Sequence, residues 1–192
     1  MNHESEIRGE EFVTRKITKG IAEYVLHQTP FTLGNLYATR DWGYAPDFVD
    51  GFWRTLQHDT PDTYVFGTGE MHTVFEFLTE ALRNAAMMTD SIPSIPIDLM
   101  IKGMPLHKVS PMPQGVADRA SQISTVTTVP PVVEITNSNM RPREAGNFCA
   151  NYSKAKRVLK WKPEVKFNRL VGLMVAYDLV SVGIDAHTCQ NW

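Results

Sequence analysis

Apolar residues recur at steps of three and four positions along much of the N-terminal half of the chain. Residues 12–26 and 47–56 both show this spacing, which predicts two amphipathic helices. Pro30 closes the first, because the residue before a proline avoids helical backbone, and Pro46 suits the first turn of the second. Residues 73–76 read T-V-F-E, a capping-box pattern that predicts the start of a third helix.

Short runs of β-forming residues stand between these helices. Residues 31–33 and 64–66 are predicted as strands, and residues 132–135 form a further β-like run. The Gly67-Thr68-Gly69 turn joins the second strand to the third helix. Such a strand–turn–helix unit is typical of α/β proteins.

Two more helices are predicted near the C-terminus. Residues 155–159 form a short helix that Trp161-Lys162-Pro163 brings to an end, and residues 170–179 carry a helical apolar period. Ser153 is the predicted cap of the short helix, and Thr14 is the predicted cap of the first helix of the chain.

Residues 90–131 differ in character from the sequence on either side. Seven of the twelve prolines lie there, with few charges and no sustained period of 2 or 3.6 residues. The segment is therefore predicted to be mostly irregular. A loop of this length is unusual inside a compact domain, so it is either a functional excursion or a disturbed stretch of sequence.

Composition places the chain among ordinary globular proteins. It has 192 residues, of which 43% are hydrophobic and 21% charged, and a formal net charge of -2. No run of eighteen apolar residues and no secretory signal is visible, so we expect a cytoplasmic protein with no membrane partner. Cys149 and Cys189 have no metal-type neighbours, so we expect free thiols and no metal site.

Positive charge gathers in one stretch. Residues 141–169 contain nine lysines and arginines against Glu144 and Glu164. A solvated surface is the favoured interpretation, and a phosphate site is the alternative. Nucleic acid ranks last, because the stretch lacks interleaved aromatic residues and the whole chain is slightly acidic.

Four motifs carry a resemblance to a known family. Residues 2–17 read N-H-E-S-E-I-R-G-E-E-F-V-T-R-K-I, and residues 33–45 read L-G-N-L-Y-A-T-R-D-W-G-Y-A. Residues 68–74 read T-G-E-M-H-T-V. The fourth motif is R-P-R-E at residues 141–144, followed by S-K-A-K and W-K-P. Together they resemble GDP-mannose 4,6-dehydratases, a family of extended short-chain dehydrogenases.

The resemblance implies an α/β fold, namely the C-terminal substrate-binding portion of an extended short-chain dehydrogenase with a remnant of the Rossmann sheet. Residues 1–192 would then form a single incomplete domain. Its parts would be family-like helix and strand units over 1–89, the Pro-rich irregular segment 90–131, and a C-terminal substrate-binding segment over 132–192.

The resemblance also assigns binding residues. Those expected to line a GDP-mannose site are Asn2, Lys16, Gly34, Asn35, Arg40, Arg141 and Glu144. Glu144 would read the guanine edge, and the arginines and Lys16 would face phosphates, for which the guanidinium fork is well suited. On spacing alone, Arg40 and Arg141 would instead pair with acidic neighbours such as Asp41 and Glu144.

His3 and Arg8 resemble positions at which the family contacts its cofactor, NADP. Glu6-Ile7 stands where the family has Pro-Arg, so one of two adjacent arginines is absent. No G-x-G-x-x-G fingerprint occurs. Tyr152 and Lys156 have the spacing of a catalytic Tyr–Lys pair, but the predicted helix start leaves Tyr152 outside the helix. The resemblance implies that the family's catalytic residues lie upstream of Asn2, so no catalytic residue is assigned.

Two functions follow from the resemblance. The family converts GDP-mannose to the 4-keto-6-deoxy sugar nucleotide with loss of water, in GDP-fucose and deoxyhexose synthesis. The chain would be one piece of such a lyase, working with a separate N-terminal half or a full-length homologue as oligomer partner. The alternative is a non-catalytic remnant that binds a GDP-sugar or another subunit.

Overall fold

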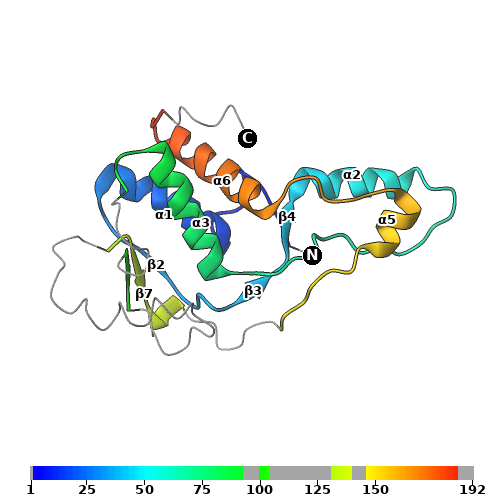
Figure 1. The fold of residues 1–192 in the computed structure, drawn as a ribbon, viewed down its shortest axis with the longest axis horizontal. Helices are drawn as coiled ribbons and strands as arrows, with labels where there is room; N and C mark the ends of the chain where they lie inside the picture. Colours follow the sequence, from blue (N-terminus) through cyan, green and yellow to red (C-terminus); the bar gives the residue numbers. More distant parts are fainter. Residues whose placement is uncertain (1, 93–99, 104–130, 140–145, 186–192) are drawn as a thin grey trace.

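A computed structural model describes residues 2–92, 100–103, 131–139 and 146–185 of the chain. Three long helices pack side by side and form the main body: α1 (Val13–His27), α3 (Val74–Met88) and α6 (Phe167–Ser181). Figure 1 shows them on one side of the molecule, with α2 and α5 on the other. We call α1, α3 and α6 the three-helix layer.

The periodicity of α1 explains its place in this layer. Ile17 and Ile21 are fully buried, and the helix ends as predicted before Pro30, with Gln28 in left-handed backbone at φ 54°. The prediction that Thr14 caps the helix was wrong. Phe12 occupies the cap position, and the Thr14 hydroxyl inside the first turn donates to buried Glu4 at 2.6 Å.

The capping box at the start of α3 is confirmed. Thr73 accepts a hydrogen bond from the Glu76 backbone N–H at 3.0 Å, and the Glu76 carboxylate accepts one from the Thr73 N–H at 2.6 Å. A buried ion pair joins α6 to α1, in which Arg15 bonds both carboxylate oxygens of Asp178, and Thr18 donates to the same group at 2.7 Å.

Among the described residues, the strands are short and form three small sheets. Strand β1 (Asn2–Glu4) pairs in parallel with β4 (Trp42–Tyr44), and β3 (Thr39–Arg40) pairs antiparallel with β5 (His72–Thr73). The third sheet has the order β2–β7–β6 and is parallel throughout, with β2 at Phe31–Leu33, β7 at Val133–Ile135 and β6 at Ile101–Lys102. A 3-10 turn, η3 (Asn137–Asn139), follows β7.

The remaining helices form a smaller unit, which we call the lobe. It contains α2 (Ala45–Leu56) and α5 (Ser153–Leu159) around a separate cluster of five buried residues: Phe48, Phe66, Ala155, Leu159 and Trp161. Asp47 connects α2 to the residues that follow α5. Its carbonyl accepts a hydrogen bond from Trp161 Nε1 at 2.7 Å, and its carboxylate accepts one from the Glu164 N–H at 2.9 Å. The predicted helix with Pro46 in its first turn is confirmed.

Two local predictions in the lobe were wrong. Residues 64–66 are not a strand, because a strand needs a hydrogen-bonded neighbour and no described residue supplies one. Ser153 is the first residue of α5 rather than its cap, and its N–H donates to the Asn151 side chain at 3.1 Å, a local bond that Asn forms readily.

The Pro-rich segment 90–131 is described only in part. Residues 90–92, 100–103 and 131 are described, and they include β6, so the expected irregular segment contains one short strand. That strand exists because Ile101 pairs with Val133 of β7. The strands predicted elsewhere, at 31–33 and 132–135, correspond to β2 and β7. The helices predicted at 155–159 and 170–179 correspond to α5 and α6.

Candidate functional site

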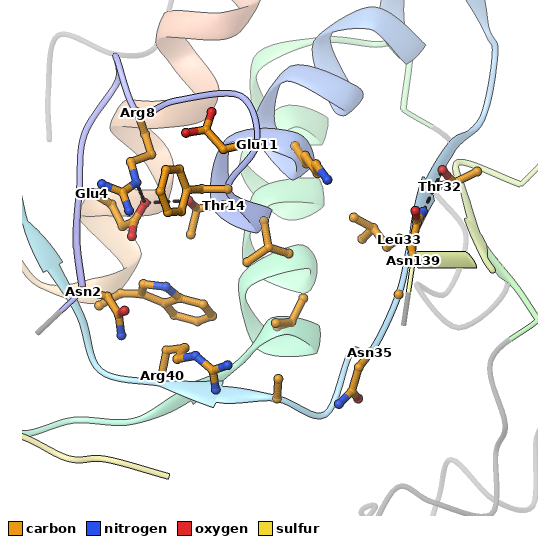
Figure 2. A pocket seen from close by; sticks show the side chains of 17 residues that line it. Asn2, Glu4, Arg8, Glu11, Thr14, Thr32, Leu33, Asn35, Arg40 and Asn139 are labelled. Carbon is orange, nitrogen blue, oxygen red and sulfur yellow. Dashed lines mark hydrogen bonds and ion pairs between the residues drawn. The ribbon is translucent and has the colours of Figure 1, made fainter. Parts of the chain in front are cut away.

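A polar pocket of about 240 Å³ lies between the start of α1 and strands β1 to β4. Six of the predicted binding residues line it: Asn2, Arg8, Lys16, Gly34, Asn35 and Arg40. They come from two stretches of the sequence, residues 2–16 and 34–40, and Figure 2 shows Asn2, Arg8, Asn35 and Arg40 around one cavity. The remaining wall includes Glu4, Glu11, Thr32 and Asn139.

The alternation of β1 determines which of its side chains reach the pocket. Successive side chains of a strand point to opposite faces, so Asn2 and Glu4 share one face and His3 takes the other. Asn2 and Glu4 line the pocket, and His3 instead places its ring 5.3 Å from the ring of Phe48 on α2. The structure therefore separates His3 from Arg8, the two residues expected to contact the cofactor.

Arg8 is held at one end of the pocket by neighbours on both sides. Its Nε lies 3.2 Å from a carboxylate oxygen of Glu4, and its guanidinium carbon lies 3.4 Å above the ring centroid of Phe12. Figure 2 shows Arg8, Glu4 and Thr14 together at this end. These contacts fix the guanidinium in place, so one planar cation faces the cavity in a defined position.

Glu4 is the buried acid of the site, and only 2% of the residue is exposed. Burial raises the pKa of its carboxyl above 4.5, while the Thr14 hydrogen bond and the charges of Arg8 and His3 act against that rise. Sequence reasoning did not select Glu4. The available signal was its position two residues after Asn2 on the same face of a strand.

Lys16 contributes a second cation from the exposed side of α1. Within the described part of the chain, no carboxylate pairs with its ammonium group. By contrast, Lys19, one turn further along α1, pairs with Glu10 at 2.6 Å and does not line this pocket. Lys16 is thus a cation at the pocket mouth whose charge is not neutralised by a described neighbour.

Arg40 supplies the third cation, from β3, where its Nη1 donates to the Thr39 carbonyl at 2.7 Å. The alternative, in which Arg40 pairs with Asp41, is not supported, because the hydrogen bonds of the Asp41 carboxylate come from other groups. Asp41 is fully buried and accepts from the Thr68 hydroxyl and from the N–H groups of Thr68, Gly69 and Ala150. Asp41 thus joins two distant loops beneath the site.

The far wall of the pocket comes from β2 and the turn after β7. Asn139 donates to the Thr32 hydroxyl at 3.1 Å, and Figure 2 shows this bond beside Leu33. Asn35 lies at the end of the same wall, where its side-chain oxygen accepts from the Tyr37 N–H at 2.9 Å. Arg141 and Glu144, which follow Asn139 in the chain, lie outside the described residues.

Other predicted features lie away from the pocket. The Tyr152 ring packs edge-on against Trp161 at 5.7 Å, and Lys156 is exposed, so their spacing builds no catalytic pair here. In the basic stretch, Lys154 pairs with Asp62 at 2.6 Å and Lys166 with Glu70 at 3.3 Å, in keeping with a solvated surface.

Three further chemical predictions concern cysteines, metals and membranes. Cys149 is an exposed free thiol, and Cys189 lies outside the described residues. No cluster of metal-ligating side chains occurs among the residues that the structure describes. None of the described helices is long and apolar enough to cross a bilayer.

Comparison with family models decides the relationship, since residues 1–174 match the model of GDP-mannose 4,6 dehydratase. The chain belongs to this family. It is 37% identical to GDP-mannose 4,6 dehydratase 2 of Arabidopsis thaliana, over 93% of this chain and 37% of the plant protein. It is 36% identical to the Homo sapiens GDP-mannose 4,6 dehydratase, over 93% of this chain and 42% of the human protein. The chain thus spans about two fifths of the length of these relatives.

Solved structures of low sequence identity share the fold. RMD from Pseudomonas aeruginosa, complexed with NADPH, matches with a TM-score of 0.64 at 14% identity, over 94% of this chain and 46% of that protein. UDP-glucuronic acid 4-epimerase from Bacillus cereus, in complex with UDP-glucuronic acid and NAD, matches with a TM-score of 0.56 at 13% identity. The latter match covers 94% of this chain and 43% of the epimerase. The mixed α/β structure therefore corresponds to less than half of a nucleotide-sugar epimerase or dehydratase fold.

Proposed function

We propose that the chain is the nucleotide-sugar-binding portion of a GDP-mannose 4,6-dehydratase and that GDP-mannose binds in the pocket between α1 and β1 to β4. The observation that carries the proposal is the convergence of two cations, Lys16 and Arg40, on one cavity that Arg8 also lines at one end. Lys16 lies on α1 and Arg40 on β3, while Arg8 lies in the loop between β1 and α1, so their meeting is a property of the fold. A diphosphate is the anion that such an arrangement suits.

The chemistry of the lining assigns a part of the ligand to each side. Lys16 and Arg40 are placed to neutralise the diphosphate, and the amides of Asn2 and Asn35 supply donors and acceptors for sugar hydroxyls. In this proposal Arg141 also binds the diphosphate, and Glu144 binds the guanine. A cavity of about 240 Å³ is smaller than the roughly 300–1,000 Å³ of typical ligand sites, so we assign it to the diphosphate and the adjoining sugar.

The NADP that the family uses would supply the hydride acceptor and donor. Arg8 fits an anionic group of this cofactor, since its guanidinium faces the cavity and its position is fixed by Glu4 and Phe12. His3 lies on the opposite face of β1, so its proposed contact with the cofactor would come from the side on which α2 lies. No proton-transfer or hydride-transfer residue is assigned to the described part of the chain.

Calorimetric titration with GDP-mannose tests the proposal. Lys16→Met should weaken binding by roughly tenfold or more, since a hydrogen bond to a charged group contributes about 1.5–3 kcal/mol. Lys19→Met is the matched control on the same helix and should bind as the unmodified chain does. Absence of heat at millimolar GDP-mannose, or equal affinity of the two variants, would contradict the proposal.

Activity is a separate question from binding. We expect the chain alone to leave GDP-mannose unchanged when NADP is added, because no catalytic residue has been assigned to it. Appearance of the 4-keto-6-deoxy product would show that the chain carries the chemistry itself. Binding without turnover is also the behaviour of the alternative, a non-catalytic GDP-sugar-binding module, and a complementing partner that restores turnover would distinguish the two.

A further inference from the structure

Helix α2 presents three different faces. Phe48 and Gly51 face the core of the lobe, where a Cβ added at Gly51 would lie 2.5 Å from the Phe66 ring and 3.0 Å from Trp161 Nε1. Asp50 and Arg54 form a polar face, paired at 2.8 Å. The third face is apolar and exposed, and its exposed fractions are 62% for Val49, 49% for Phe52, 60% for Trp53 and 81% for Leu56.

These four side chains form a continuous stripe. They stand at positions i, i+3, i+4 and i+7 of the helix, the spacing that places residues along one side. Scattered exposed apolar residues are ordinary, whereas an aligned set marks a surface that another element covers. Sequence reasoning predicted one apolar side for this helix, but the structure buries only Phe48 of the residues assigned to it.

An unpaired β-like segment continues the stripe. The Phe52 ring lies 5.5 Å from the Phe66 ring, and Val65 between Tyr64 and Phe66 is 45% exposed. Residues 64–66 have the composition of a strand, yet no described strand pairs with them. A partner that covers this surface would offer both an apolar face and a strand edge.

The family match indicates which part of the protein could cover the α2 stripe. Relatives are more than twice as long as the matched region, which is 37% of the Arabidopsis protein and 42% of the human one. The shared fold is likewise 46% of the Pseudomonas structure. We propose that the α2 stripe, namely Val49, Phe52, Trp53, Leu56 and the adjoining Val65, docks the part of a GDP-mannose 4,6-dehydratase that lies outside the matched region.

A second copy of this chain fits the stripe less well. A helix of twelve residues is only about 18 Å long, and a stable interface buries about 800 Å² on each partner. A lipid surface is disfavoured too, since the polar face of α2 offers a single arginine that is already paired with Asp50.

Co-expression tests the docking proposal without requiring the plant part to be stable alone. The 192-residue chain is produced together with the part of Arabidopsis GDP-mannose 4,6 dehydratase 2 outside the match, and the complex is purified through a tag on the plant part. The Val49→Ser/Leu56→Ser variant is compared with Val180→Ser/Leu26→Ser. The control carries the same two substitutions at exposed positions of α6 and α1, where Val180 is 59% and Leu26 46% exposed.

We expect the unmodified chain and the control to be recovered in complex, and recovery of the stripe variant to fall at least about tenfold, as loss of central interface side chains does. Circular dichroism and melting of each chain alone confirm that the variants fold. Equal recovery of both variants, or no complex with the unmodified chain, overturns the proposal. The readout needs no sugar nucleotide, so it is independent of GDP-mannose binding.

Hydroxyl-radical footprinting supplies a second readout on the purified complex. Oxidation of Trp53 and Leu56 should fall at least about fivefold on complex formation, because a central interface residue is shielded from solvent. Tyr177, 43% exposed on α6, should stay as reactive as in the free chain. Unchanged Trp53 oxidation overturns the assignment. The assignment is also overturned if the free chain sediments as a dimer or binds lipid vesicles through the stripe, because the stripe would then contact a second copy or a membrane instead.

Discussion

The three-helix layer and the lobe bury their apolar residues to very different extents. Among the described residues, the layer and the strands packed against it share a cluster of twenty-five buried residues, among them Ile17, Phe77 and Met174, each with no exposed surface. The lobe has a cluster of five, and its helix α2 turns four large apolar side chains outward. The layer therefore buries its large apolar residues within the chain, whereas the lobe leaves a row of them exposed.

The two regions also differ in what they offer a ligand. The polar pocket draws Arg8 and Lys16 from the layer's side of the molecule, and its cations are placed by elements packed into the large core. The lobe offers an apolar surface and an unpaired segment. We infer that the chain uses the layer to position small-molecule contacts and the lobe to make a protein contact.

Removing one large core side chain from each region should separate their stabilities. Phe77 and Trp161 are both fully buried, and either change to Ala should cost about 3–5 kcal/mol. Phe77→Ala should lower the stability of the whole chain. Trp161→Ala should unfold only α2 and α5, because a core of five residues contributes little stability beyond that of its largest side chain.

Hydrogen exchange measured by mass spectrometry checks this prediction. In Trp161→Ala, amide protection should fall in α2 and α5 and persist in α1, α3 and α6. Equal loss of protection in all five helices would show that the two regions unfold as one unit, and the division proposed here would be wrong.

The same aspartate–arginine pair occurs once in each region. Asp178 in the layer pairs with Arg15 at 2.8 Å with its side chain 2% exposed, and Asp50 in the lobe pairs with Arg54 at 2.8 Å with 46% exposed. Asp178→Ala should destabilise the chain by at least about 3 kcal/mol, since it leaves a largely buried guanidinium without its partner. Asp50→Ala should cost about 0.2–1 kcal/mol. Urea unfolding measures both, and equal costs would contradict the difference in burial.

Local sequence signals predicted the elements of both regions, but only partly their packing. The periodicity of residues 12–26 and the T-V-F-E box gave α1 and α3, because those signals act within a few residues. Residues 64–66 failed as a strand because pairing depends on a distant partner that composition does not reveal. The apolar side of α2 was visible in the sequence, but periodicity does not tell whether a neighbour exists to cover it.

The candidate site was predictable through resemblance more than through pattern. Asn2, Lys16 and Arg40 have no common spacing, and only the fold brings them to one pocket. The roles of Glu4 and Asp41 were missed because each depends on burial. Glu4 accepts a hydrogen bond from the Thr14 hydroxyl, and Asp41 accepts hydrogen bonds from N–H groups of two loops that lie far along the chain.

One glycine in each region tests how tightly the lobe and the three-helix layer are packed. A Cβ on Gly51 of α2 would lie 2.5 Å from the Phe66 ring, whereas one on Gly172 of α6 would meet the Asn84 side-chain oxygen at 3.1 Å. Gly51→Ala should destabilise the lobe by about 1–3 kcal/mol through overpacking. Gly172→Ala should be close to neutral, since the gain of about 1 kcal/mol in helix propensity offsets a small shift of Asn84. Thermal and urea unfolding measure the two variants, and a neutral Gly51→Ala would show that the lobe core is loosely packed.

The smallest expected effect is a pair of opposite pH dependences. Burial raises the pKa of Glu4 above 4.5, so the folded chain binds the proton more tightly, and stability falls as pH rises from about 4.5 through the raised pKa. In the lobe, the Lys154 hydrogen bond lowers the pKa of Asp62 below 3.8, so stability rises with pH through that lower window. Urea midpoints from about pH 3 to 8 for Glu4→Gln and Asp62→Asn, each subtracted from the unmodified chain, measure the two slopes. Glu4→Gln should remove the decline and Asp62→Asn the rise, and slopes of the same sign would mean that Glu4 keeps its charge in the pocket despite its burial.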